Sequence, residues 1–136
     1  MQRWILGLGL ALAPAFAVAD ETPSEHDWLT KHPVIQQLVE LTNQHRARSG
    51  LAPLKLNPRM CLDAQRHATY MADYNYFAHS GLPYRENIYM GPRSPQDAVN
   101  GWIYSPAHHA NMLSGTECGF GYMVRNGQPA WVAVFR

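Results

Sequence analysis

Three polar side chains that are distant along the chain have the types used in metal-binding and hydrolytic sites. His79 and Glu86 are seven positions apart in FAHSGLPYRENIYMG, where serine, glycine and proline predict a turn between them. His108 follows in SPAHHANML, where serine and proline predict the start of a helix. We expect the turn and the helix to bring the three side chains to one cleft.

The chemistry of this trio has two readings. Two neutral imidazoles and a carboxylate suit Zn²⁺ or another divalent cation, with an open fourth position that could activate water. The candidate metal ligands are therefore His79, Glu86 and His108. The same cluster is equally well explained as a hydrogen-bonded network that holds three elements together. Because the chain contains no HExxH segment, we favour weak metal binding over metal catalysis.

A hydrolase is the alternative enzyme class. Ser80 adjoins His79, but neighbouring residues of an extended segment point to opposite sides. Ser105 lies near His108 but is better explained as a helix N-cap, and His109 is expected to face solvent. The chain has no G-x-S-x-G nucleophile motif. No residue is therefore assigned a catalytic role, and a metal-dependent or serine-type peptidase or esterase stays an open alternative.

A non-catalytic binding module is the interpretation from another class. Five aromatic residues flank the predicted cleft: Tyr76, Tyr84, Tyr89, Trp102 and Tyr104. An aromatic rim with polar edges is typical of sites for an extended peptide, glycan or lipid. Rim tyrosines also occur without any ligand, so peptide, glycan, lipid and protein partners all stay open.

Hydrophobic periodicity and start signals predict the elements that must position these residues. Three main helices and a short one are expected over Val34–Arg48, Pro58–Tyr74, Pro95–Tyr104 and Pro106 to about Leu113. Strands are expected over Asn87–Met90, Phe120–Val124 and Ala130–Phe135, the last two joined by a turn at Asn126-Gly127. The predicted fold class is α+β, a small antiparallel sheet with helices on both faces.

The N-terminus is typical of a secretory signal peptide. Arg3 precedes an apolar run, Pro14 breaks it, and Ala17-Val18-Ala19 has the small residues of a cleavage site. We expect a signal peptide over 1–19, a loosely ordered lead-in over 20–32 and one domain over 33–136. Cleavage would leave no membrane span and a periplasmic or secreted protein.

The charge balance excludes one class of partner. Without Arg3 the mature chain carries ten Lys and Arg against ten Asp and Glu. A neutral chain without basic runs lacks the electrostatic footprint of nucleic-acid binding.

Two cysteines, Cys61 and Cys118, lie in the mature chain. In an oxidising compartment an even pair favours a disulfide over a metal site. A disulfide between them would close a loop of 57 residues (118 minus 61) and stabilise the fold by about 4 kcal/mol in the chain-entropy model. The competing reading is two buried, reduced thiols.

Several segments, in order along nearly all the mature chain, resemble the CAP superfamily of cysteine-rich secretory, antigen 5 and pathogenesis-related proteins, in its small bacterial secreted branch. They are LTNQHRARSGLAPLKLNPRMCLDAQRHATYMA, HSGLPYRENIYMG, NGWIYSPAHHANML and TECGFGYMVRNGQPAWVAVFR. The resemblance implies an SCP-like, three-layer αβα sandwich whose cleft is lined by His79, His108 and Glu86, sometimes with a divalent metal.

The resemblance also marks departures from the family pattern. Ser105 stands where many eukaryotic members have a second acid, and Glu117 matches a glutamate before the closing strand. Arg85 replaces a glycine before Glu86, where it could cover the cleft or pair with the carboxylate. These three are second-tier cleft residues. Cys118 replaces an aliphatic residue, which favours its pairing with Cys61.

Overall fold

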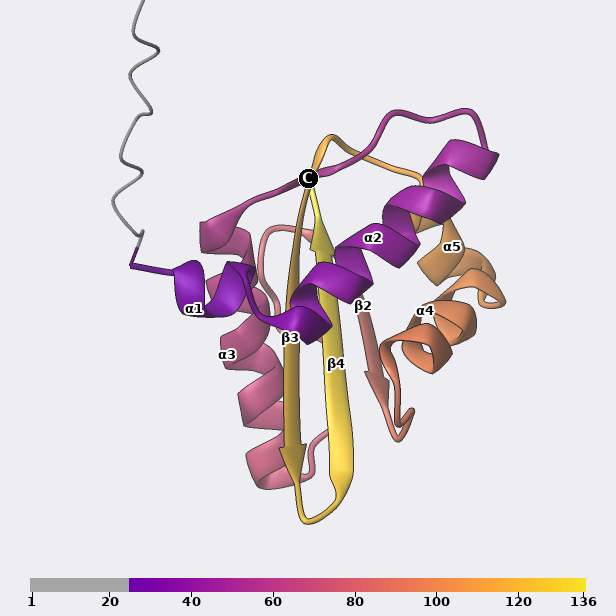
Figure 1. Ribbon diagram of the computed structural model, residues 1–136. Helices are drawn as coiled ribbons and strands as arrows, with labels where there is room; N and C mark the ends of the chain where they lie inside the picture. Colours follow the sequence, from indigo (N-terminus) through magenta and orange to yellow (C-terminus); the bar gives the residue numbers. More distant parts are fainter. Residues whose placement is uncertain (1–24) are drawn as a thin grey trace, which may run out of the picture.

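The computed structural model describes residues 25–136. The expected signal peptide, 1–19, and the lead-in up to residue 24 lie outside the described residues. The elements are α1 (Asp27–Thr30), α2 (Pro33–Arg48), β1 (Lys55–Leu56), α3 (Pro58–Tyr74), β2 (Arg85–Met90), α4 (Pro95–Ile103), α5 (Pro106–Met112), β3 (Glu117–Arg125) and β4 (Gln128–Phe135). Figure 1 shows one twisted sheet with α3 behind it and α2 crossing in front.

Polar caps followed by proline begin the longer helices. The Asn57 side chain accepts a hydrogen bond from the Met60 N–H at 3.1 Å, and α3 ends at Asn75 in the left-handed conformation, φ 48°. Ser94 caps α4 by accepting from the Asp97 N–H, also at 3.1 Å. Such caps satisfy backbone donors that a helix start leaves unpaired, which is why these helices lie almost at their predicted bounds.

The lead-in is more ordered than expected. Its last residues form α1, a single helical turn, and Leu29 of that turn is 2% exposed within the hydrophobic core. Burying one leucine gives the turn an apolar contact that fixes it to the domain. A single turn is too short to show a helical period, so the prediction of a loose segment is wrong for the described part.

The four strands form one sheet in the order β1-β3-β4-β2. The pairs β3–β4 and β2–β4 are antiparallel, as expected, and β3–β4 is the predicted hairpin. The short β1, in the connector after α2, pairs parallel to β3. The sheet is therefore mixed, and β2, beside β4 alone, is an edge strand that carries Glu86.

Alternation along β4 separates two cores, as the period of two in a strand requires. Ala130, Val132 and Val134 pack with the α3 residues Ala64 and Met71. The intervening β4 residues pack toward α2, α4 and α5: Trp131, Ala133 and Phe135. The fold is thus the expected αβα arrangement, an α+β domain with helices on both faces of the sheet.

Two glycines let α3 lie directly against β3. A Cβ added at Gly119 would overlap the backbone of Met60 and Cys61, and one at Gly121 would overlap the backbone of Ala64. Only glycine allows such an approach of helix to strand. The contact fixes α3, from whose C-terminal end the chain turns back to His79.

The disulfide prediction is wrong for this structure, because Cys61 and Cys118 are both free. Each is fully buried in the same core, on α3 and β3. Burial raises the pKa of Cys61 to about 11, opposed by a hydrogen bond with the Phe120 backbone. Burial, with the nearby Cys61, raises the pKa of Cys118 to about 12. The two thiols therefore pack as small apolar groups, as buried cysteines commonly do.

Candidate functional site

The Glu86 carboxylate is the centre of the candidate site. Glu86 lies near the start of β2 and is 8% exposed. Its Oε1 accepts hydrogen bonds from His79 Nδ1 at 2.8 Å and from the Ser80 N–H at 2.9 Å. Its Oε2 accepts a short hydrogen bond from the Ser80 hydroxyl. A buried carboxylate is stabilised by such donors, and here all of them come from the turn after α3.

His79 is held by this carboxylate at the surface, where 65% of its side chain is exposed. Because a carboxylate only accepts, the Nδ1 atom of the neutral ring carries the proton. The Nε2 atom then has a free lone pair. The turn therefore holds one oriented imidazole at the surface, with its Nε2 atom available to a partner.

His108 reaches the same region from the first turn of α5. The Asn87 amide donates to the His108 carbonyl at 2.9 Å, and the Asn111 amide donates to the Asn87 side-chain oxygen, also at 2.9 Å. These bonds dock α5 on β2. Burial, together with the nearby His79, lowers the pKa of His108. The structure thus places His79 against Glu86 and puts His108 on the helix that docks on the same strand. That the three side chains form one site stays a prediction.

A cavity of about 240 Å³ opens beside the trio. It is lined by Phe77, Ile88, Tyr89, Gly101, Ser105 and His108. A Cβ at Gly101 would overlap the ring of Tyr89, so that glycine lets the ring approach α4 closely as one wall of the cavity. The cleft therefore combines apolar walls with imidazole and hydroxyl groups.

The fit of this site to a metal ion is limited by Glu86. In residues 25–136, no group of three or more His, Cys, Asp or Glu side chains is arranged to hold a metal ion. Both Glu86 oxygens already accept hydrogen bonds from the His79–Ser80 turn. Zinc sites in proteins use at least three protein ligands, and here two imidazoles are left. Metal binding by the trio stays a prediction.

Comparison with known proteins settles the family. Residues 39–135 match the model of the cysteine-rich secretory protein family, CAP. The chain belongs to the CAP family. Two relatives are 32% identical: YkwD of Bacillus subtilis, over 65% of this chain and 42% of the relative, and pathogenesis-related protein 1 of Arabidopsis thaliana, over 62% and 55%.

A solved CAP structure has the same fold. An extracellular protein with an SCP domain from Bacillus anthracis superposes with a TM-score of 0.62 and 25% identity, over 75% of this chain and 40% of that one. The chain spans about half the length of the curated relatives it matches. None of the helices described between residues 25 and 136 has the length and hydropathy needed to cross a bilayer.

The second-tier residues of this CAP domain lie at different distances from the trio. Ser105 lines the cavity and is the N-cap residue of α5, as predicted, although its side chain makes no capping hydrogen bond. Arg85 is exposed on β2 and forms no ion pair with Glu86. Glu117 lies on β3, where its hydrogen bonds with Arg136 and then with Asn57 lower the pKa of its carboxyl. Ser105 alone of the three lines that cavity.

One pair of residues was missed by the sequence argument. His109 does not simply face solvent: its Nε2 lies 2.8 Å from Nε2 of His45 on α2, and the ring centroids are 4.9 Å apart. Burial, then the nearby His109 and Arg48, lowers the pKa of His45. The partners are 64 positions apart, so no local spacing could have indicated the contact.

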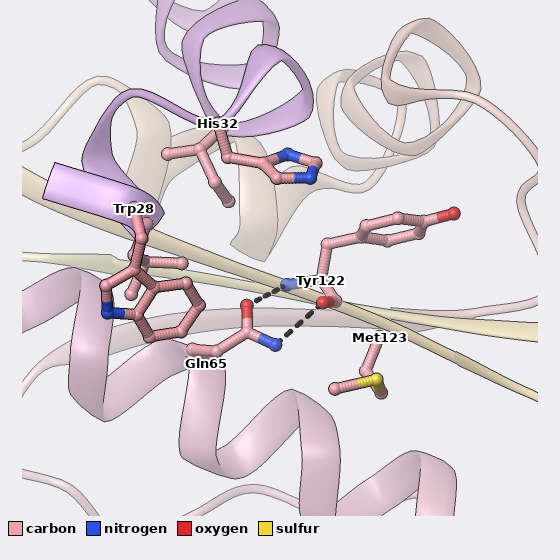
Figure 2. Close-up of a pocket in the computed structure, with 7 residues that line it drawn as sticks. Trp28, His32, Gln65, Tyr122 and Met123 are labelled. Carbon is pink, nitrogen blue, oxygen red and sulfur yellow. Dashed lines mark hydrogen bonds between the residues drawn. The ribbon is translucent and has the colours of Figure 1, made fainter. Parts of the chain in front are cut away.

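A second cavity of the CAP domain, of about 200 Å³, lies between α1, α2, α3 and β3. Figure 2 shows Trp28, His32 and Met123 around it, with the Gln65 amide directed at the backbone of Tyr122. Gln65 donates to the Tyr122 carbonyl at 2.7 Å and accepts from the Tyr122 N–H at 2.9 Å. The glutamine thus satisfies the free edge of β3 where β1 no longer pairs with it.

Proposed function

We propose that this CAP-domain protein is a periplasmic or secreted binding module that holds its ligand in the cleft of His79, Glu86 and His108 and catalyses no reaction there. The observation that carries the proposal is the state of the Glu86 carboxylate, which accepts three hydrogen bonds from the turn at His79 and Ser80. A general base needs a lone pair that reaches the substrate. Glu86 instead orients His79.

The chemistry of the cleft favours a neutral ligand. His79 offers an oriented Nε2 acceptor, and the lowered pKa of His108, caused by burial and by His79, favours its neutral form. Phe77 and Tyr89 supply apolar walls. Such a site suits a ligand whose hydroxyl or amide groups lie on an apolar body. A divalent ion, held by the two imidazoles, would bind weakly by comparison with a three-ligand site.

The hydrolase alternative finds little support in the geometry. The Ser80 hydroxyl donates to Glu86 and accepts from the Leu82 N–H at 3.0 Å, so no histidine takes its proton. A serine nucleophile requires a neighbouring base at hydrogen-bond distance. Ser105 lines the same cavity as His108. If the protein did have a serine nucleophile, Ser105 would be the candidate.

A turnover assay tests the proposal. Wild type, His79→Ala and His108→Ala are assayed on broad peptide and ester panels with and without Zn²⁺, with His26→Ala as a matched control outside the cleft. We expect rates equal to buffer for every protein. Zinc-dependent turnover in wild type and His26→Ala that disappears in both cleft variants would replace the binding module with a metallohydrolase.

Binding is measured separately by following the ring resonances of the histidines during a titration with Zn²⁺ and with small hydroxylated aromatic compounds. We expect selective changes at His79 and His108 with the compounds, and weak changes with the metal. Changes at His26 alone would contradict a ligand site in this cleft.

A further inference from the structure

A third cavity lies between α3 and the turn that holds His79. Its volume is about 390 Å³, and it is formed by the outer face of α3 and the turn that follows it. It is lined by Arg59, Asp63, Arg66, His67, Tyr70, Ser80 and Leu82. We call it the α3 groove. Nothing in the cleft proposal uses it, although Ser80 borders both.

Two guanidinium groups give the α3 groove its charge. The Arg59 Nε lies 3.2 Å from Asp63, and its two terminal nitrogens have no partner among residues 25–136. The Arg66 side chain, also exposed, makes no hydrogen bond or ion pair in that part of the chain. Asp63 is the one acid in the lining, and its buried carboxylate is already engaged by Arg59 and by the Tyr84 hydroxyl at 3.0 Å. These open donors are therefore suited to bind an anion.

The spacing of the two arginines sets the separation of the carboxylates that the ligand must carry. Arg59 and Arg66 are seven positions apart on α3, so they lie on one face about 10 Å apart along the axis. Guanidinium groups bind carboxylates through two parallel hydrogen bonds. A ligand with two carboxylates at this separation would engage both arginines at once.

Aromatic rings extend the α3 groove at its far end. Tyr70 is 49% exposed, and its ring lies 4.8 Å from that of Tyr74 and 6.1 Å from that of Tyr76. His67 donates from Nε2 to the Ala78 carbonyl at 2.7 Å, which leaves Nδ1 to accept from a hydroxyl. Exposed aromatic rings beside hydroxyl acceptors suit the C–H face and the hydroxyl groups of a sugar ring.

We propose that the α3 groove binds an acidic saccharide, its carboxylates paired with Arg59 and Arg66 and one sugar ring stacked on Tyr70. The arginines alone would accept any anion of suitable length. The tyrosine cluster and the free His67 nitrogen are what favour a carbohydrate over an acidic peptide, whose side chains have no flat apolar face for Tyr70. The site is distinct from the cleft and does not depend on the proposed function.

Calorimetric titration of the full mature chain with tetragalacturonate tests the proposal, with the methyl ester of the same saccharide as the uncharged probe. We expect tetragalacturonate to bind and the ester to bind at least tenfold more weakly. Arg66→Gln should weaken binding about tenfold, the loss of one charge-assisted pair. Tyr70→Leu should weaken it severalfold, and Arg93→Gln, an exposed arginine outside the groove, should leave it unchanged. Raising the salt concentration should weaken binding to wild type because exposed charge pairs are screened.

Three results would overturn the proposal. Equal affinity for the ester would remove the role of charge, and equal affinity for tetraglutamate would make the ligand an acidic peptide. Equal affinity of wild type and Arg66→Gln would place any binding elsewhere. Arg66 makes no hydrogen bond or ion pair within residues 25–136, so Arg66→Gln should fold, and circular dichroism of the variant checks this. His108→Ala, altered in the cleft, should retain groove binding, so the two proposals fail independently.

Discussion

At the scale of single residues, the position of Glu86 decides what the site can do. Glu86 is buried on an edge strand, and its carboxylate is occupied by donors of the preceding turn. In the proposed cleft it is therefore His79, and not the carboxylate, that would contact a ligand. The sequence predicts that His79, Glu86 and His108 meet, because a turn and a helix start are local signals. It does not predict that Ser80 occupies the second Glu86 oxygen, which depends on the hydroxyl rotamer in the folded turn.

The lowered pKa values of His45 and His108 predict a dependence of stability on pH. Below pH 6.5 the unfolded chain binds protons that these folded rings bind only at lower pH. The free energy of unfolding should therefore fall as the pH falls below 6.5, and should not change through these rings above it. Urea denaturation between about pH 5 and pH 8 measures the effect.

Two histidine variants test whether His45 and His108 cause the dependence of stability on pH. His45→Gln and His108→Gln should each reduce the slope of stability against pH by up to one bound proton per ring, because a glutamine does not titrate. His26→Gln, which changes neither ring, is the control. A slope unchanged in both variants would mean that other groups carry the acid sensitivity.

At the scale of elements, α3 and β3 form the rigid part on which the site is built. Their close contact depends on Gly119 and Gly121, and the helix then carries the chain to the His79 turn. Helix bounds follow from local caps and prolines, so they are predictable. Strand β1 is two residues long and α1 is one turn long, and both depend on tertiary contacts: β1 pairs with β3, and α1 buries Leu29 in the core. Such short elements have too few residues to show a sequence period.

Gly119→Ala tests this contact. The added methyl group would overlap the backbone of Met60 and Cys61, so helix and strand must separate. We expect a loss of about 3 kcal/mol in the free energy of unfolding, measured in urea. Gly81→Ala is the matched control: it has open space around its Cβ and should cost about 1 kcal/mol, from its positive φ of 77°. Equal losses in the two variants would contradict the packing argument.

At the scale of the whole molecule, stability comes from two apolar cores and not from a covalent cross-link. The sequence favours a disulfide between Cys61 and Cys118 because the chain has an even number of cysteines and is expected in an oxidising compartment. Neither fact says how the two side chains pack. Both thiols are fully buried, with pKa values raised to about 11 and about 12 by burial. The fold class could be predicted from the hydrophobic pattern and from the family resemblance. Whether the two cysteines are free or bonded could be seen only in the tertiary structure.

Thiol titration checks the state of the cysteines. We expect two reactive thiols in the unfolded, unreduced protein, and none in the native protein on the timescale of minutes, because burial disfavours the thiolate. Reductant should leave the denaturation midpoint unchanged, whereas opening a disulfide across this loop would lower stability by about 4 kcal/mol. No reactive thiol in the unfolded protein would restore the cross-link.

The Gln65 amide bears on how copies of this chain behave at high concentration. Strand β3 pairs with β1 only at Glu117 and Cys118, and a row of open backbone groups on such a strand is a template on which neighbouring molecules stack. By occupying Tyr122 midway along that row, Gln65 interrupts the template. We therefore expect the side chain that fills a gap inside one molecule to reduce the assembly of many molecules into fibres.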